Sequence, residues 1–134
     1  MSNHLTNLDS YLNNEVDNGR IIAELAVKKK THLNPDDNEG HLTVDVFQTK
    51  DEIIIQSAIA GADPDEIDIS ISKDVVTIKG TREPEHKIKS TDYFHQEIYW
   101  GRFSRAIILP ADVNPDKAKA AFKNGILTIS LPKL

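Results

Sequence analysis

The sequence predicts an all-β domain at residues 41–134, preceded by a short, partly helical N-terminal arm at residues 1–40. Three observations favour a β-sandwich or barrel. Apolar residues alternate with polar ones along several runs after residue 41, the runs recur about every ten residues, and turn-forming residues separate them. The length of 134 residues fits one domain with a short extension.

The arm follows a different pattern from the rest of the chain. Between Val16 and Lys30 the apolar residues form a narrow stripe with helical spacing, at Ile21, Ile22, Leu25 and Ala26. The lysines at 28–30 suit the C-terminal end of such a helix. The turn-rich sequence at 34–40 then predicts a linker, which places the domain boundary at Gly40.

Strands are expected wherever the apolar period is two. The clearest example is the alternation of isoleucine with Asp68, Ser70 and Ser72. The expected strands cover 42–47, 53–59, 67–72, 75–80, 103–109 and 127–131. Asn124-Gly125 predicts a tight hairpin, because both residues tolerate a positive φ. A helix through Ala121 is an alternative for the segment after Asn114, with Pro115 in its first turn. The alternation before the hairpin favours a short strand there.

A long polar segment interrupts the domain. Residues 81–92 are almost entirely charged or polar, with Ile88 the lone aliphatic residue, and they meet Tyr93-Phe94. Polar loops of this length are uncommon inside a compact domain and are usually functional. We expect this loop to reach a second subunit.

Composition excludes several function classes. The net charge of −5 argues against a nucleic-acid partner, and the absence of cysteine removes disulfides, thiolate metal sites and cysteine nucleophiles. The five histidines lack metal-ligand spacing, and no glycine-rich phosphate loop or nucleophile elbow occurs. We therefore expect no metal, no cofactor and no enzymatic activity. With no apolar run of about 20 residues and no visible secretion signal, the expectation is a cytoplasmic protein without membrane contact.

Four ordered segments resemble the Hsp20 or α-crystallin family of small heat-shock proteins. The first is Val44-Asp45-Val46 together with the run that begins at Ile53, the second is 58–61 together with 66–69, and the third is 76–80. The fourth is 97–105, which continues to Leu109-Pro110 and is followed by 120–127 and by Leu131-Pro132-Lys133. The last segment is similar to the family's "G.F.R…LP … A…NGVL…LPK" pattern. The resemblance covers residues 41–133 and is closest to the bacterial, archaeal and plant branch.

The resemblance implies an immunoglobulin-like sandwich of seven to eight strands that acts as an ATP-independent holdase for partly unfolded client proteins. It also implies a homodimer built by an exchanged loop strand, with larger oligomers left open. The residues implied at that interface are Tyr93, Phe94 and His95 on the loop, Leu42, Val44 and Val46 on the partner's edge strand, and Arg105.

Other positions keep two interpretations. Arg105 lies in an apolar strand, where it is an exposed edge residue or an interface residue paired with Glu97 or Asp45. Tyr99 and Trp100 fit core, interface or client contacts. A client or tail groove is implied at Ile67, Ile69, Ile71, Leu127 and Ile129, which alternation alone assigns to the core.

Two departures from the family pattern affect assembly. Ala60 stands where the family usually has proline, and the sequence ends at Leu134 without the family's I/V-x-I/V tail. We therefore expect a dimer building block rather than a large cage. The alternative is a CS/p23-like adaptor sandwich that binds one defined protein partner.

Overall fold

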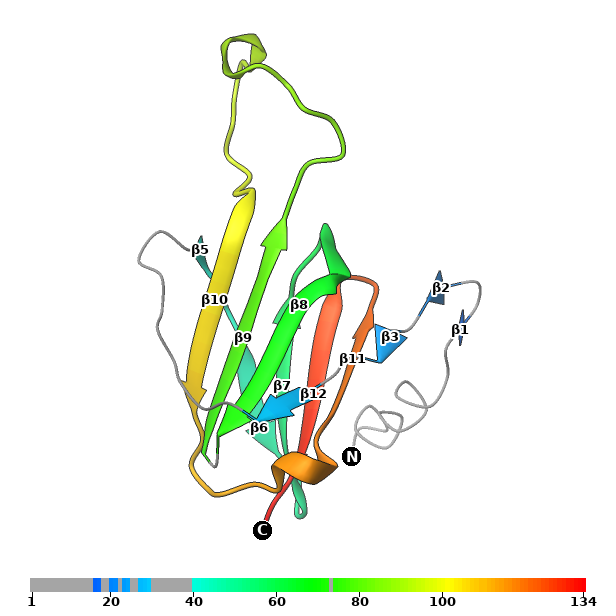
Figure 1. Ribbon diagram of the computed structural model, residues 1–134, viewed down its shortest axis with the longest axis vertical. Helices are drawn as coiled ribbons and strands as arrows, with labels where there is room; N and C mark the ends of the chain where they lie inside the picture. Colours follow the sequence, from blue (N-terminus) through cyan, green and yellow to red (C-terminus); the bar gives the residue numbers. More distant parts are fainter. Residues whose placement is uncertain (1–15, 18–19, 22, 25–26, 30–39, 73) are drawn as a thin grey trace.

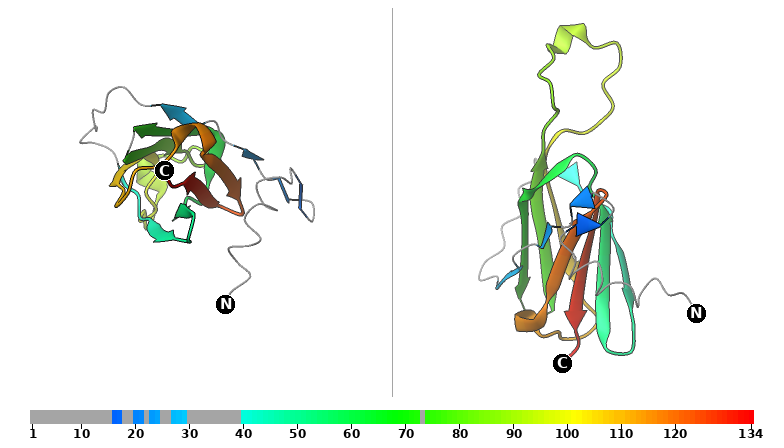
Figure 2. Two further views of the ribbon diagram at one scale, coloured as in Figure 1. Left: turned by 90° about the horizontal axis from the view of Figure 1, so that it is seen from below. Right: turned by 90° about the vertical axis from the view of Figure 1, so that its right-hand side faces the viewer.

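The computed structural model describes residues 16–17, 20–21, 23–24, 27–29, 40–72 and 74–134. Within them two five-stranded sheets stack face to face (Figures 1 and 2). The strand order is β4-β8-β9-β10-β5 in the first sheet and β3-β11-β12-β7-β6 in the second. The predicted all-β sandwich is confirmed.

The long strands coincide with the predicted runs. They are β6 (Asp45–Gln48), β7 (Glu52–Ala58), β8 (Ala62–Ser72), β9 (Val75–Arg82), β10 (Gly101–Ile108), β11 (Lys119–Lys123) and β12 (Ile126–Pro132). All of these pair antiparallel, whereas β5 (Gly40–His41) pairs parallel with β10. β8 begins well before its isoleucine run, because a register irregularity between Ala62 and Ile67 accommodates Pro64.

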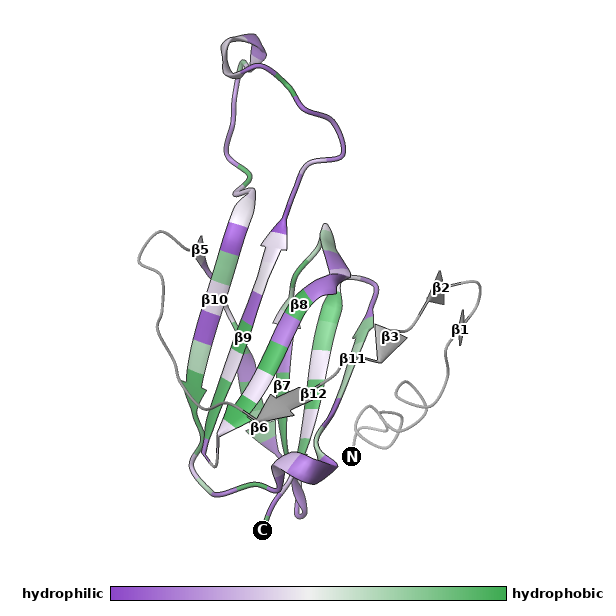
Figure 3. Cartoon of the chain, viewed as in Figure 1, coloured by the Kyte–Doolittle hydropathy of each residue, from purple (hydrophilic) through white to green (hydrophobic). Residues whose placement is uncertain are grey.

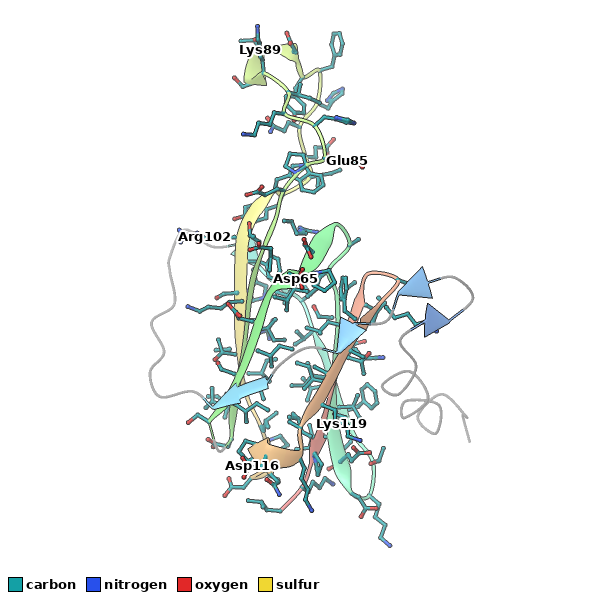
Figure 4. All side chains as sticks on the ribbon, turned by 45° about the vertical axis from the view of Figure 1, so that its right-hand side comes forward. Asp65, Glu85, Lys89, Arg102, Asp116 and Lys119 are labelled. Atoms are coloured by element: carbon teal, nitrogen blue, oxygen red, sulfur yellow. The ribbon has the colours of Figure 1, made fainter. Side chains whose placement is uncertain are left out.

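Isoleucine fills most of the space between the sheets. Ile69 and Ile78 of the first sheet and Ile129 of the second are fully buried, and the core also holds the rings of Phe103 and Phe122. β-branched side chains suit strands because their preferred rotamers pack well on a pleated surface. Hydropathy alternates along the strands (Figure 3), and side chains from both sheets fill the interior (Figure 4).

Two turns near the C-terminus follow their local sequence. Asn124 and Gly125 have φ of 54° and 77° between β11 and β12, which confirms the predicted hairpin. The 3-10 helix η2 (Pro115–Lys117) precedes β11, and the Asn114 side chain accepts a hydrogen bond from the Asp116 backbone N–H. The chain then pairs with β12, so the short strand is confirmed and the alternative helix through Ala121 does not form.

The described part of the arm is extended rather than helical. It consists of β1 (Val16–Asp17), β2 (Arg20–Ile21), β3 (Ala23–Glu24) and β4 (Val27–Lys29). The helix predicted for residues 16–30 is thus not observed at these positions. Helical spacing is a local signal, whereas β3 and β4 pair with the sheets at β11 and β8, which the local pattern does not report. Of the linker predicted at 31–40, residues 31–39 lie outside the described residues, and Gly40 belongs to β5.

Candidate functional site

A long loop connects β9 to β10 and projects beyond the end of both sheets (Figures 1 and 2). Its only regular element among the described residues is the 3-10 helix η1 (Ser90–Asp92), and Lys89 lies at its far end (Figure 4). Although the loop is largely hydrophilic, it carries exposed apolar side chains: Phe94 is 99% exposed and Ile98 is 64% exposed. Apolar side chains presented this way are typical of a surface that contacts another protein.

The base of this loop is anchored to the sandwich. The Tyr99 hydroxyl donates to the Arg102 carbonyl, and the Tyr99 ring lies against Gly40, where a Cβ would be 2.6 Å from a ring carbon. The Trp100 ring lies close to Gly61 in the turn before β8. Tyr99 and Trp100 therefore both make contacts within the chain, although Tyr99 remains 42% exposed.

The loop residues assigned to an exchanged strand differ in accessibility. Tyr93 is half-buried, whereas Phe94 and His95 are exposed. The structure describes one chain, so their pairing with a second subunit stays a prediction. Their accessibility is what that prediction requires.

The edge strand assigned to the same interface is only partly accessible. β6 is the last strand of its sheet in the described residues and pairs on one side only, with β7. Val46 on β6 is 41% exposed, but Val44 is half-buried against the core and Leu42 is 7% exposed within it. Of the three, Val46 is the side chain best placed to meet another chain.

Arg105 lies on the inner face of β10, between Phe103 and Ile107. Its Nη1 donates to the Leu42 carbonyl oxygen at 2.9 Å and lies 3.0 Å from His41 Nε2. Within the described chain its hydrogen-bond partners are thus a backbone carbonyl and a histidine, rather than the predicted Glu97 or Asp45. These contacts connect the start of the domain, at His41 and Leu42, to β10. A role for Arg105 across an interface stays a prediction.

The five residues assigned to a client or tail groove lie together in the core. None is more than 5% exposed, and all belong to one buried cluster: Ile67, Ile69, Ile71, Leu127 and Ile129. β12 is a central strand, between β11 and β7. Any access to these side chains must therefore come from the side of the sandwich where β8 and β11 lie, since a face-on approach meets the backbone of the sheets.

Sequence reasoning missed Arg82, at the end of β9. Its Nη1 donates to the Ala60 carbonyl at 3.2 Å, but its buried Nε has no hydrogen-bond partner in the described chain. Arg82 lines an open pocket of about 340 Å³ together with Leu42, Tyr99 and Phe103. A buried donor without an acceptor is uncommon, so this pocket is a candidate contact for another chain. An arginine at the boundary between a strand and a polar loop gives no such signal in sequence.

A metal site and a membrane-spanning helix each place requirements on the described residues. They contain no group of three or more His, Asp or Glu side chains able to hold a metal ion. In the same part of the chain, no helix has the length and apolar character needed to cross a membrane. What the described residues present is a sandwich whose strand β6 pairs on one side only, and a hydrophilic loop that carries a few exposed apolar side chains.

This arrangement defines a β-sandwich of the α-crystallin type, and comparison with known proteins agrees. Residues 45–134 match the model of the Hsp20/alpha crystallin family. The chain therefore belongs to the Hsp20/α-crystallin family, which confirms the resemblance seen in the sequence.

Two bacterial relatives illustrate the extent of the likeness. Small heat shock protein C4 of Rickettsia felis is 33% identical over 131 residues, which cover 97% of this chain and 78% of that protein. Small heat shock protein C2 of the same organism is 38% identical over 89 residues, which cover 66% of this chain but only 58% of that protein's length.

Solved structures agree on the fold. Heat shock protein 16.0 from Schizosaccharomyces pombe superposes with a TM-score of 0.69 at 31% identity, covering 75% of this chain and 72% of that one. The hspA protein from Xanthomonas axonopodis gives a TM-score of 0.65 at 27% identity, covering 71% of this chain and 95% of that one.

Proposed function

We propose that this protein is an ATP-independent holdase that binds partly unfolded proteins and limits their aggregation. The observation that carries the proposal is the set of exposed apolar side chains on the hydrophilic loop of a sandwich of the small heat-shock protein family. Burial of apolar surface is worth roughly 25 cal/mol per Å², so exposed side chains outside the exchanged segment, such as Ile98 and Ile108, can contribute to the capture of apolar client segments. The proposal includes no enzymatic step, no cofactor and no nucleotide.

Dimerisation through the loop is part of the same proposal. Tyr93, Phe94 and His95 would add to the free edge of β6 in a second copy, near its Val46. Such an exchange satisfies an open strand edge and covers exposed apolar side chains at once. Weak single contacts with a client would then gain avidity, because a dimer presents every binding surface twice.

Holdase activity is tested by light scattering from a heated client protein. We expect excess chain to lower the scattering equally with and without ATP, and an unrelated β-sandwich protein at equal mass to have no effect. No reduction of scattering with the chain in excess over the client would contradict the proposal.

Dimerisation is tested separately by native mass measurement. Phe94→Ser is expected to shift the assembly toward monomer, because it removes the most exposed apolar side chain of the loop. Lys89→Ser at the loop's far end is the matched control and should leave the mass unchanged. Equal masses for both variants would argue against the exchanged strand.

A cytoplasmic location belongs to the proposal. The cysteine-free sequence is compatible with a reducing compartment, where disulfides are rare. Fractionation of cells that express the tagged chain tests it.

A further inference from the structure

The pocket beside Arg82 lies between the two sheets, at the end of the sandwich that carries the long loop. Arg82 is the last residue of β9 and is aligned with Gly101, the first residue of β10 (Figure 1). β7 of the other sheet contributes Ala58 to the lining, and the chain before β6 contributes 40–43. The volume of about 340 Å³ is near the lower limit of ordinary ligand sites, so the pocket fits one side chain or a small molecule.

The side chain of Arg82 belongs to the inner face of β9. Side chains alternate along a strand, so Arg82 shares a face with the buried Ile78 and with Gly80, which lies against the Phe103 ring. Its Nη1 donates to the Ala60 carbonyl at 3.2 Å, whereas its Nε is shielded from solvent and has no acceptor among the described residues. A buried N–H without an acceptor costs free energy, so a ligand that supplies the acceptor is favoured here.

The surroundings of the pocket are positively charged. Of the described residues that line it, Arg82 and His41 are basic and none is Asp or Glu. Arg105 adds a second guanidinium beside the lining, because its Nη1 lies 3.0 Å from His41 Nε2. The nearby Glu66 and Glu83 line a separate pocket. An anion is therefore the class of ligand that complements this pocket.

The walls of the pocket select among anions. Leu42 and Phe103 are buried core residues, and together with Ala58 they make one side of the pocket apolar. A guanidinium binds a carboxylate through two parallel N–H···O bonds, in which the Nε–H can be one of the donors. A carboxylate on a short apolar group suits both sides of the pocket. Inorganic phosphate has polar oxygen atoms all round and would place some of them against the apolar wall.

We propose that the pocket between Arg82, Leu42 and Phe103 binds a carboxylate carried on a small apolar group, with the Arg82 guanidinium as its main contact. A small rotation of the Arg82 side chain turns Nε toward the pocket, and the carboxylate supplies the acceptor that Nε lacks. The carboxylate comes either from a free monocarboxylate or from an acidic residue of a polypeptide bound beside Thr43, next to the start of β6. The site goes beyond the holdase proposal, because its binding requires no unfolded client.

Isovalerate is the probe, because it joins one carboxylate to a branched apolar group. NMR of the isotope-labelled chain follows the Arg82 Nε–H and the Gly61 amide, which adjoins the carbonyl that Arg82 contacts. We expect a saturable shift of both signals with a Kd of about 1–30 mM, ordinary for a ligand of this size. No saturable shift well above that range, at constant ionic strength, would overturn the proposal.

Isovaleramide tests the need for the charge, since it has nearly the same shape and no carboxylate. It should bind at least about tenfold more weakly, because hydrogen bonds between charged groups are stronger than neutral ones. Equal binding of the acid and the amide would overturn the carboxylate assignment. Inorganic phosphate should also bind more weakly than isovalerate, and tighter binding of phosphate would overturn the choice of anion.

Variants test the role of Arg82. Arg82→Gln should weaken isovalerate binding at least about tenfold, measured on the Gly61 amide. Arg102→Gln is the matched control, because it makes the same change at an exposed position of β10 outside the lining, and it should bind like wild type. Arg82→Lys keeps the charge but not the Nε–H and should bind about 2–10-fold more weakly, the effect of one hydrogen bond. It also replaces Arg82→Gln if that variant does not fold. Wild-type affinity in the Arg82 variants would overturn the proposal.

Competition decides the source of the carboxylate. An acetylated and amidated Leu-Glu-Leu peptide carries only an internal acidic side chain, and its Leu-Gln-Leu counterpart carries none. Displacement of isovalerate by the first peptide alone supports the pocket and assigns it to polypeptides as well as small molecules. Displacement by neither supports the pocket and assigns it to small carboxylates. Equal displacement by both peptides would overturn the role of the carboxylate.

Discussion

Gly80 lies at a crowded point of the β9 backbone, and replacing it with alanine should destabilise the sandwich. A Cβ at this position would be 2.5 Å from Phe103 Cζ and 2.9 Å from the Glu66 carbonyl oxygen. Carbon atoms attract best at about 3.5–4.0 Å, so the overlap with the ring is about 1 Å. Phe103 is 3% exposed and belongs to the core, so its ring cannot retreat without moving its neighbours.

The expected loss follows from two opposing terms. Overpacking a core costs about 1–3 kcal/mol, whereas Gly→Ala lowers the entropy of the unfolded chain and returns about 0.4–1 kcal/mol. Gly80 is not among the residues with positive φ, so backbone strain adds nothing. The steric overlap outweighs the entropy gain, so the free energy of unfolding should fall by about 1–2 kcal/mol. Each kcal/mol lowers the Tm by about 4–8 °C for a domain of this size. Urea unfolding at fixed protein concentration measures it.

A double-mutant cycle checks the cause. Phe103→Leu removes the ring atoms that overlap with the new Cβ but leaves the Glu66 carbonyl in place. Gly80→Ala with Phe103→Leu should therefore be less destabilised than the sum of the single variants, by about 0.5–2 kcal/mol. The reasoning is refuted if Gly80→Ala lies within about 0.5 kcal/mol of wild type, the usual range for a neutral surface change, or if the two losses simply add.

Three further predictions concern the hairpin, Arg105 and the loop. Gly125→Ala should cost about 1–2 kcal/mol, because φ is +77°, while Asn124→Gly at +54° should cost less; urea unfolding distinguishes them. Arg105→Ala leaves the Leu42 carbonyl without its donor and should cost about 1–3 kcal/mol, partly recovered in Arg105→Lys; an unchanged urea midpoint would contradict this. Phe94→Ser should lower the native mass at concentrations where wild type is dimeric. At a concentration where wild type is monomeric it should leave the Tm unchanged, since the Phe94 side chain is 99% exposed and packs little within the chain.

The central strands were predictable because one face of each is buried. In β8 the alternation of Ile67, Ile69 and Ile71 with exposed Asp68 follows from the two-residue period of a strand between core and surface. The hairpin at Asn124 was predictable for a different reason, its intrinsic tolerance of positive φ. Both signals lie within a few residues of sequence.

The arm and the arginine contacts depend on partners far away in the chain. The spacing of apolar residues around Ile21 satisfies a helix locally, yet Ala23 pairs with Phe122. Arg105 likewise donates to the Leu42 carbonyl, 63 residues away, and no charge pattern identifies a backbone acceptor. Sequence therefore flagged Arg105 as unusual without identifying the residues that it contacts within the chain.

The burial of the predicted groove residues constrains how clients are held. Ile69 and Ile129 are fully buried, so they are available only where a strand edge opens. The apolar side chains that are already accessible are scattered, with Phe94 on the loop and Ile108 at the end of β10. A fully buried side chain of this size contributes about 1.5–3 kcal/mol, and a scattered few leave little after the entropy lost on association. Useful affinity under the holdase proposal therefore requires either backbone edges that pair with the client or repeated weak contacts across an assembly.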